Sequence, residues 1–302
     1  MSAECVMKCL REGGHFIVGC DIYPGEWHYE TRLCDKFIRA PFASDEDKYI
    51  EFLLDTCREY GLECIIPLTD LEIDVINDHR QMFEKSNVLL CMQNSDVLAI
   101  ARNKYELYSY FKDDEYVPSV KTSLLLNLPS DFKFPCIAKP LNGRSSEGLI
   151  RNATLEQVEA INNKALYIVQ EQLEGYIYTV DFCRSSKTGV CCAIPRKELL
   201  RTKNGAGLTV QICNDCKLMN QTTHIGEKLN INGCVNMEFI FCGDKYYLID
   251  INPRFSAGVA FSVMMGYNMV TNHLNCFCDK EIGSQISLDE RIIIKKYEEI
   301  FI

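Results

Sequence analysis

The feature that most constrains the fold is a β-hairpin near the end of the chain. Two stretches, Val235–Phe241 and Tyr246–Asn252, alternate apolar and other side chains and are joined by the short turn Cys242–Lys245. This pattern predicts two antiparallel strands. Paired about that turn, Glu238 and Asp250 are expected to lie across from each other. The hairpin therefore predicts an antiparallel sheet with two neighbouring carboxylates.

The second strand of the hairpin is expected to have two different faces. Side chains two apart on a strand share a face, so Asp250 and Asn252 should point the same way. On that period Leu248 extends the polar face, and Ile249 and Ile251 pack behind it. One face would then carry the chemistry while the other is buried.

This polar face suits a divalent cation and phosphate. Mg²⁺ or Mn²⁺ takes oxygen ligands, usually one or two carboxylates plus substrate phosphates. Pro253 ends the strand, and Arg254 would meet phosphate oxygens as a fork. The alternative is a solvated hairpin face with ordinary surface acids, which is the better interpretation of a lone D-x-N. The further motifs below favour a site.

Helices and strands alternate through the first hundred residues, which is typical of a parallel sheet. The expected elements are helix Glu4–Glu12, strand Phe16–Cys20, helix Asp45–Tyr60, strand Cys64–Leu68 and helix Glu72–Lys85. Asp21 and Asp70 follow the two strands, where ligands of open α/β sheets collect, although both residues could instead cap the next segment. No G-x-G-x-x-G precedes Asp21, so a dinucleotide-binding role is rejected.

The chain opens in a helix, so we expect this α/β domain to lack its first strand. The alternative is that this version of the domain begins later. The exposed sheet edge would then be covered by another element or by a second chain, as in a homodimer.

Length and composition limit the partners. The chain has 302 residues, which suggests about two domains. Its net charge of -10 argues against a nucleic-acid partner. We expect no membrane association, because no apolar run approaches the roughly 20 residues of a bilayer span, and no signal pattern opens the chain. A cytoplasmic location with reduced, buried cysteines is expected.

A second region carries lysines and a flexible loop. A helix is expected over Ser95–Phe111 and includes Lys104. A strand ending at Lys139 leads into the Gly- and Ser-rich loop Leu141–Gly148, whose backbone N–H groups are suited to phosphates. The expected elements after the loop are strand Leu149–Arg151, helix Leu155–Asn162 and strand Tyr167–Gln170. Taken alone, the loop is more often an ordinary turn.

Taken together, these motifs resemble the ATP-grasp superfamily, and within it the large chain of carbamoyl phosphate synthetase. The residues that carry the resemblance are, in order, Lys104, Lys139 with its loop, Gln170–Gly175, Glu238 and Asp250–Arg254. The resemblance covers nearly the whole chain, and the closing hairpin is its most specific part.

The resemblance implies a role for each matching residue. Lys104 and Lys139 would contact nucleotide phosphates, and the loop with Gly143, Ser145, Ser146 and Gly148 would close over them. Glu171 and Leu173 would line the adenine. Glu238, Asp250 and Asn252 would hold Mg²⁺ or Mn²⁺. Arg254, and Arg196 on an earlier strand, would meet the transferred phosphoryl group or the substrate. For Arg196 a solvated charge at a strand end is an equal alternative.

Two departures from the family pattern stand out. Relatives usually carry a glutamate for the ribose hydroxyls where this chain has Ile177, which leaves Glu174 or Asp181 as replacements. The usual metal-binding glutamate is shortened to Asp250, which keeps the charge, and metal binding is expected to survive.

The resemblance implies an α/β fold in two parts. Residues 1–94 would form an N-terminal parallel α/β (pre-ATP-grasp) domain, and residues 95–302 an ATP-grasp domain of two α+β subdomains, with the small lid subdomain at about 112–172. The implied function is an ATP- and Mg²⁺-dependent carboxylate-amine ligase that acts through an acyl phosphate and forms ADP. Its partners would be small carboxylate and amine substrates. The alternative is a nucleotide-binding module without turnover; synthesis of carbamoyl phosphate is a weaker third, because relatives use two such modules for it.

Overall fold

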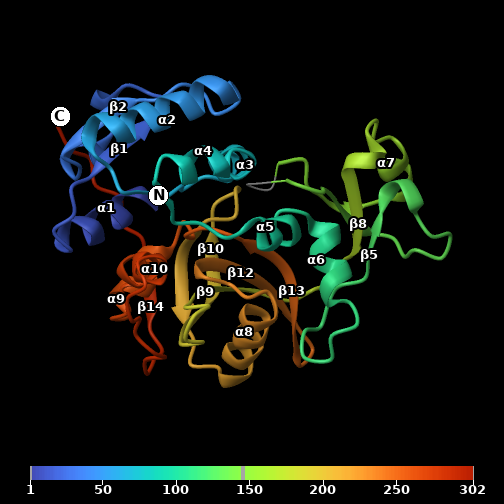
Figure 1. The fold of residues 1–302 in the computed structure, drawn as a ribbon. Helices are drawn as coiled ribbons and strands as arrows, with labels where there is room; N and C mark the ends of the chain where they lie inside the picture. Colours follow the sequence, from blue (N-terminus) through green and yellow to red (C-terminus); the bar gives the residue numbers. More distant parts are fainter. Residues whose placement is uncertain (1, 144–146, 302) are drawn as a thin grey trace.

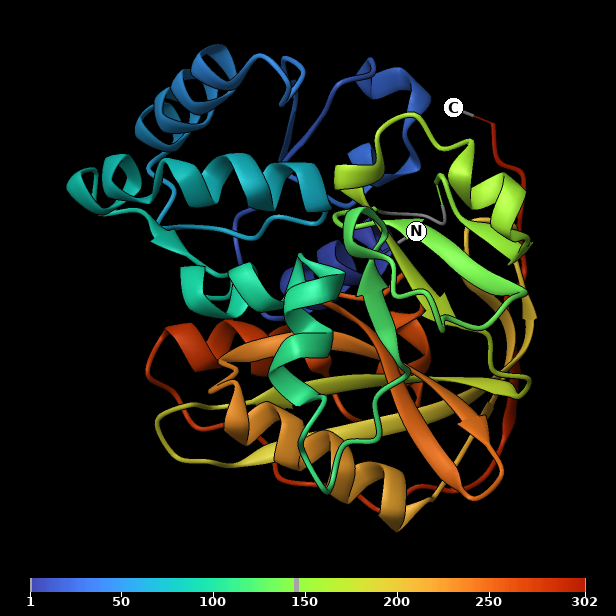
Figure 2. The same ribbon diagram turned by 90° about the vertical axis from the view of Figure 1, so that its right-hand side faces the viewer.

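The computed structural model describes residues 2–143 and 147–301. Figure 1 shows three regions: an N-terminal α/β region in blue and cyan, a small sheet in green, and a large sheet in yellow to red. In the turned view of Figure 2, the N-terminal region and the small sheet lie above the large sheet. No helix among the described residues is long and apolar enough to cross a bilayer.

The N-terminal region confirms the prediction of parallel strands between helices. Its elements are α1 (Ala3–Glu12), β1 (Val18–Asp21), β2 (Lys36–Arg39), α2 (Glu46–Tyr60), β3 (Cys64–Ile65), α3 (Asp70–Asp78), α4 (Arg80–Lys85) and β4 (Leu89–Leu90). The strands form two parallel pairs, β1 with β2 and β3 with β4. The single helix expected over Glu72–Lys85 is divided at His79, and α3 begins earlier because Thr69 and Glu72 form a capping box.

The helix expected over Ser95–Phe111 is also two helices, α5 (Ser95–Ala101) and α6 (Lys104–Phe111). Between them Asn103 has extended backbone, and its side chain accepts hydrogen bonds from the backbone N–H groups of Tyr105 and Glu106. An asparagine in this position caps a new helix. The break makes Lys104 the first residue of α6.

The small sheet is antiparallel and has the strand order β5-β8-β6-β7. Its elements are β5 (Thr122–Leu124), β6 (Cys136–Pro140), β7 (Ile150–Ala153), α7 (Leu155–Glu159) and β8 (Tyr167–Glu171). Its own core includes Cys136, Ala138, Val158 and Val169, all buried, so the small sheet packs as a unit.

The large sheet is antiparallel and has the order β13-β12-β9-β10-β11-β14. Its elements are β9 (Tyr176–Arg184), β10 (Cys191–Arg201), β11 (Gly207–Ile212), α8 (Cys216–Lys228), β12 (Gly233–Cys242), β13 (Lys245–Asn252), α9 (Val259–Met264), α10 (Met269–Phe277) and β14 (Ile292–Ile294). Strand β14 lies at one edge of this sheet. Between α9 and α10, Gly266 has a positive φ of 95°.

The two faces of the large sheet are covered differently. On one face, Val180, Phe182, Met237 and Phe239 form a core with α8, α5 and α6. On the other face, helices α1, α9 and α10 cover only the half that carries apolar residues. These residues are Cys183, Cys192, Ile194 and Cys234. The same strands continue beyond this cover with polar side chains, and there the face meets the small sheet.

Candidate active site

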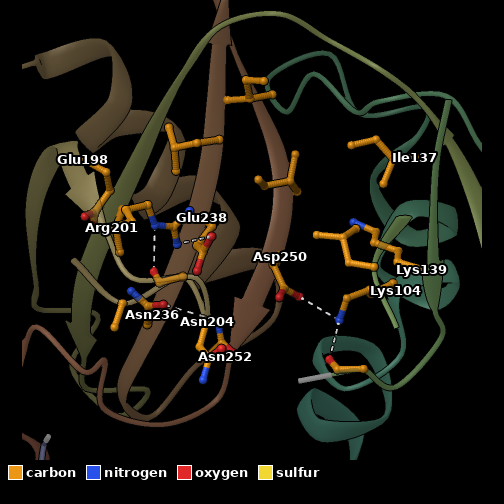
Figure 3. Close-up of a pocket in the computed structure, with 18 of the residues that line it drawn as sticks. Lys104, Ile137, Lys139, Glu198, Arg201, Asn204, Asn236, Glu238, Asp250 and Asn252 are labelled. Carbon is orange, nitrogen blue, oxygen red and sulfur yellow. Dashed lines mark hydrogen bonds and ion pairs between the residues drawn. The ribbon is translucent and has the colours of Figure 1, made fainter. Parts of the chain in front are cut away.

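A cavity of about 450 Å³ lies between the small sheet and the uncovered half of the large sheet. Its walls come from β6 and β8 on one side and from β9, β10, β12 and β13 on the other. The start of α6 and the loop after β13 complete it. Figure 3 shows labelled side chains from these elements around one space. This cavity is the candidate active site.

The predicted acidic face forms one wall of the cavity. Glu238 on β12 is the cross-strand partner of Asp250 on β13, and Asn236 is the partner of Asn252. All four residues line the cavity, and Asn252 Nδ2 donates to Asn236 Oδ1 at 3.3 Å. Two carboxylates and two amides therefore face the same space.

A β-bulge decides which residues of β13 face the cavity. The pairing changes register between Glu238 and Phe239, and this leaves Ile249 as the extra residue on β13. As a result Leu248 is only 5% exposed in the core, whereas Ile249 and Asp250 both line the cavity. The prediction that Leu248 shares the polar face and Ile249 packs behind it was wrong, because a strict period of two fails at a bulge.

Two lysines enter the cavity from the opposite side. Lys104 Nζ lies 3.5 Å from Asp250 Oδ1 and donates to the carbonyl oxygen of Gly143 at 3.0 Å. Lys139 on β6 donates to Gln170 Oε1 at 3.1 Å. The cavity therefore brings together the cations and the anions that lie far apart in the sequence.

The environment of Lys139 changes its acid–base chemistry. Burial lowers the pKa of Lys139 to about 8, and the positive charge of Lys104 also lowers it, while Asp250 and Glu238 act in the opposite direction. Burial disfavours the charged form of an amine. Lys139 can therefore gain or lose its proton near neutral pH.

The donor set on the large sheet fits a divalent cation only with help from a ligand. In the structure, Glu238 accepts a hydrogen bond from Arg201 at 3.0 Å, and Asp250 forms an ion pair with Lys104. Among the described residues, no three His, Cys, Asp or Glu side chains gather into a metal site. Two carboxylates with the amide oxygen of Asn252 suit Mg²⁺, which commonly completes its octahedron with water and substrate phosphates. The residues present fit Mg²⁺ bound together with a nucleotide.

Arg254 is held by the N-terminal region. Its Nε donates to Asp70 Oδ1 at 3.0 Å and its Nη2 to Asp70 Oδ2 at 2.8 Å. Nη2 also reaches Asn252 Oδ1 at 3.4 Å, and Nη1 donates to the carbonyl oxygen of Phe255 at 3.2 Å. A guanidinium has five N–H donors, so one Nη1 donor has no partner among the described residues.

Arg196 is buried inside β10, and the alternative of a solvated charge at a strand end was wrong. Its side chain is about as enclosed as a core residue, with 2% of the residue exposed. Nη1 donates to Asp181 at 2.7 Å, Nε to Glu198 at 3.3 Å, and Nη2 to Ser256 Oγ at 3.1 Å. Glu198 lies two residues away on the same strand, but Asp181 comes from the neighbouring strand β9, and that pairing is defined only in the folded sheet.

The residues expected at the nucleotide base surround one end of the cavity. Glu171 and Leu173 line it, as does Ile177, whose cross-strand partner Ile240 also lines it. Neither Glu174 nor Asp181, the proposed replacements for a ribose-binding acid, is among the lining residues, and Asp181 instead accepts from Arg196 and from Ser262. Neither proposed replacement for a ribose-binding acid therefore lines the cavity.

The predicted lid loop is only partly described. Gly143 lines the cavity, and Ser145 and Ser146 lie outside the described residues. Gly148 has a positive φ of 69° and does not line the cavity; a Cβ there would come 2.8 Å from Tyr167 Oη. Gly148 thus serves the turn of the loop, where glycine is favoured.

The lining residues that the sequence analysis did not assign to the site include Thr179, Glu198, Arg201 and Asn236. Glu198 and Asn236 lie two positions from predicted site residues on the same strands, so the period of two contains the signal that would have found them. Arg201 carries no such signal, because the register of β10 shifts before it.

Comparisons with known proteins identify two family models that match parts of the chain. Residues 163–300 match the family model described as ATP-grasp in the biosynthetic pathway with Ter operon. Residues 30–91 match the model described as PylC-like, N-terminal domain. A comparison with curated protein sequences finds no match.

Solved structures with the same fold include biotin carboxylases. A biotin carboxylase–β,γ-ATP complex from Campylobacter jejuni has a TM-score of 0.80 and 14% identity, covering 96% of this chain and 72% of that one. The biotin carboxylase domain dimer of Hydrogenobacter thermophilus 2-oxoglutarate carboxylase, with MgADP, ADP and bicarbonate, has a TM-score of 0.78 and 15% identity, covering 94% and 69%. Rhizobium etli pyruvate carboxylase has a TM-score of 0.76 and 15% identity, covering 92% of this chain and 28% of that one. The resemblance to the ATP-grasp superfamily is thereby confirmed: residues 163–300 match an ATP-grasp family model, residues 30–91 match a PylC-like N-terminal domain, and the chain shares its fold with these biotin carboxylases.

Proposed function

We propose that this protein is an ATP- and Mg²⁺-dependent carboxylate-amine ligase that forms ADP through an acyl phosphate. The observation that carries the proposal is the cavity in which Lys104 and Lys139 face Glu238, Asp250 and Asn252. Two of the structural neighbours were solved with ATP-type or ADP ligands, which supports a nucleotide in this cavity.

In this proposal each group has a separate role. Lys104 and Lys139 bind nucleotide phosphates, Gly143 belongs to the loop above them, and Glu171 and Leu173 line the adenine. Glu238, Asp250 and Asn252 would hold Mg²⁺. When bound, this ion would neutralise negative charge on the phosphates.

The reacting end of the cavity lies toward Arg254. The carboxylate substrate would attack the terminal phosphorus of ATP, breaking its bond to ADP, and the amine would then displace phosphate from the acyl group. The free Nη1 donor of Arg254 would hydrogen-bond the transferred phosphoryl group as its charge changes. Arg196, three of whose five N–H donors bond Asp181, Glu198 and Ser256, would act by positioning the loop that carries Arg254.

We also propose the division into residues 1–94 and 95–302, with a lid at about 112–172. The first part would supply Asp70 to the site of the second. A homodimer is part of the same proposal, supported by the domain dimer of the Hydrogenobacter thermophilus neighbour. Light scattering after gel filtration measures the assembly.

Release of ADP measured against a panel of amino acids tests the reaction. We expect ADP formation that needs both a carboxylate and an amine. Tight ATP binding without carboxylate-stimulated hydrolysis would exclude the ligase and favour the nucleotide-binding module, an alternative supported by Ile177 where relatives carry a ribose-binding acid.

The variant Asp250→Ala tests the site. We expect it to weaken Mg²⁺-dependent nucleotide binding on the order of 100-fold or more, because even outer-sphere partners of a bound metal are worth about 10- to 100-fold. The matched control is Asp244→Ala, which removes an exposed carboxylate from the turn of the same hairpin. Unchanged affinity for Mg-nucleotide in Asp250→Ala, measured by calorimetry, would contradict the assignment.

A further inference from the structure

Two buried side-chain oxygens, on residues that line the cavity, have no hydrogen-bond partner among the described residues. They are Oε2 of Glu198 on β10 and Oγ1 of Thr179 on β9. The Glu198 side chain is 2% exposed and Thr179 is 3% exposed. Buried polar groups are nearly always paired, so each exception calls for an explanation. A ligand that supplies hydrogen-bond donors is one.

The two atoms belong to one patch of the sheet. Thr179 is the cross-strand partner of Arg196, and Glu198 is two residues further along β10 on the same face. Such diagonal positions are about 7–8 Å apart. Oε1 of Glu198 is occupied by Arg196 Nε, so only Oε2 is left for another group.

This patch is connected to the proposed reacting end of the cavity. Arg196 joins Glu198 to Ser256, and Ser256 lies two residues after Arg254. Ser256, Ala257 and Gly258 line the cavity with Glu198. A group held by Glu198 is therefore on the same side of the cavity as Arg254.

The chemistry of the patch selects the kind of ligand. A carboxylate oxygen only accepts hydrogen bonds when ionised, so it repels phosphates and substrate carboxylates. A divalent cation would find one free carboxylate oxygen there, because the nearby Asp181 is bonded by Arg196 and Ser262. An ammonium group has three donors and one positive charge, which suits Oε2 together with Oγ1.

We infer that Glu198 and Thr179 form the binding subsite for a protonated primary amine, the second substrate of the ligase. This inference rests on the proposed function. It adds the residues that recognise the amine and the charge state in which the amine binds. Gly207 belongs to the subsite, because a Cβ at that position would lie 2.4 Å from Glu198 Oε2.

The test compares Glu198→Gln with the wild-type protein in the ADP-release reaction. Glutamine keeps the shape and removes the charge. The amine panel consists of amino acids, ethanolamine and ammonium chloride, and the best substrate among them is used. We expect the KM for this amine to rise about tenfold or more in Glu198→Gln, because a hydrogen bond to a charged group is lost. The affinity for ADP should stay within about twofold. Glu51→Gln, on the exposed side of α2, is the control for a lost charge.

Thr179→Val is the second variant and covers the case in which Glu198→Gln fails to fold. Valine matches the shape of threonine without the hydroxyl, and we expect a rise of about threefold to tenfold in the same KM. An unchanged amine KM in a folded Glu198→Gln protein would overturn the inference. A weakened ADP affinity with an unchanged amine KM would also overturn the inference, because it would assign Glu198 to the binding of the nucleotide hydroxyls.

A thermal-shift measurement separates the two proposals. If the wild-type protein turns over no carboxylate and amine pair, the ligase proposal fails. The amine panel is then added to the ADP-bound protein. An amine that raises the Tm of the wild type but not of Glu198→Gln supports the subsite without the reaction, and the absence of any such shift overturns it.

Discussion

Lys139 is a half-buried lysine that the proposed function places against the nucleotide phosphates. Its pKa of about 8 reflects burial. Neutral lysine cannot pair with a phosphate, so apparent affinity should follow the protonated fraction. We expect the dissociation constant of ADP to rise about tenfold from about pH 7 to about pH 9, because a group with this pKa is mostly neutral at the higher value. Calorimetry across this range measures it.

The control for this pH dependence is Lys139→Arg. Arginine keeps its charge throughout the range, so the ADP affinity of this variant should change much less with pH. A wild-type profile as flat as that of Lys139→Arg would contradict the expectation that the protonation of Lys139 controls ADP binding in this range.

A β-bulge decides which side chains of strand β13 face the cavity. The bulge at Ile249 turns Leu248 into the core and leaves Ile249 at the cavity. Leu248→Ala should therefore lower the free energy of unfolding by about 2–5 kcal/mol. Ile249→Ala should cost about 1 kcal/mol or less, because its side chain is not part of the close-packed core. Urea unfolding of the two variants gives the comparison. A larger loss of unfolding free energy in Ile249→Ala than in Leu248→Ala would contradict the bulge and favour a strand with a strict period of two.

The N-terminal region and the large sheet are joined by charges from distant parts of the chain. Asp70, 4% exposed, accepts two hydrogen bonds from Arg254 and lies 3.4 Å from Arg102, which also binds Asp74. Removing one partner of a buried ion pair leaves the other unpaired. We expect Asp70→Ala to lower the free energy of unfolding by about 3–5 kcal/mol. We also expect it to lower the rate at which ADP is formed. Urea unfolding and turnover measure the two effects.

Asp74→Ala is the matched control, because this side chain is 44% exposed and also pairs with Arg102. An exposed pair is worth about 1 kcal/mol or less. If Asp74→Ala were as destabilising as Asp70→Ala, the link between the regions would not depend on Arg254.

Acid should weaken the same link. Burial raises the pKa of Asp70, but the hydrogen bonds and charge of Arg254, with the charges of Arg102 and Lys104, outweigh it and hold the pKa below its usual value of 3.8. The unfolded chain therefore binds this proton more readily. The stability from Asp70 is present above about pH 4 and is lost as the pH falls through its lower folded value.

Local patterns in the sequence were enough to predict much of the molecule. The hairpin, the alternating helices and strands, and the pairing of Glu238 with Asp250 depend on side-chain period and on turn residues close in the chain. The same patterns missed the short strands β2 and β4. They also missed the helix break at Asn103, where a side-chain cap outweighed helical spacing.

The amino-acid sequence by itself determined the elements, the antiparallel hairpin and the kinds of side chain available for a nucleotide and a metal. Only the tertiary structure decided that Arg196 is buried, that Ile249 bulges and that Asp70 holds Arg254. Periodicity is a property of neighbouring residues, whereas register and ion pairing depend on which strands and helices meet. Asp70 and Arg254 are 184 residues apart, and their contact exists only because packing brings α3 to the end of β13.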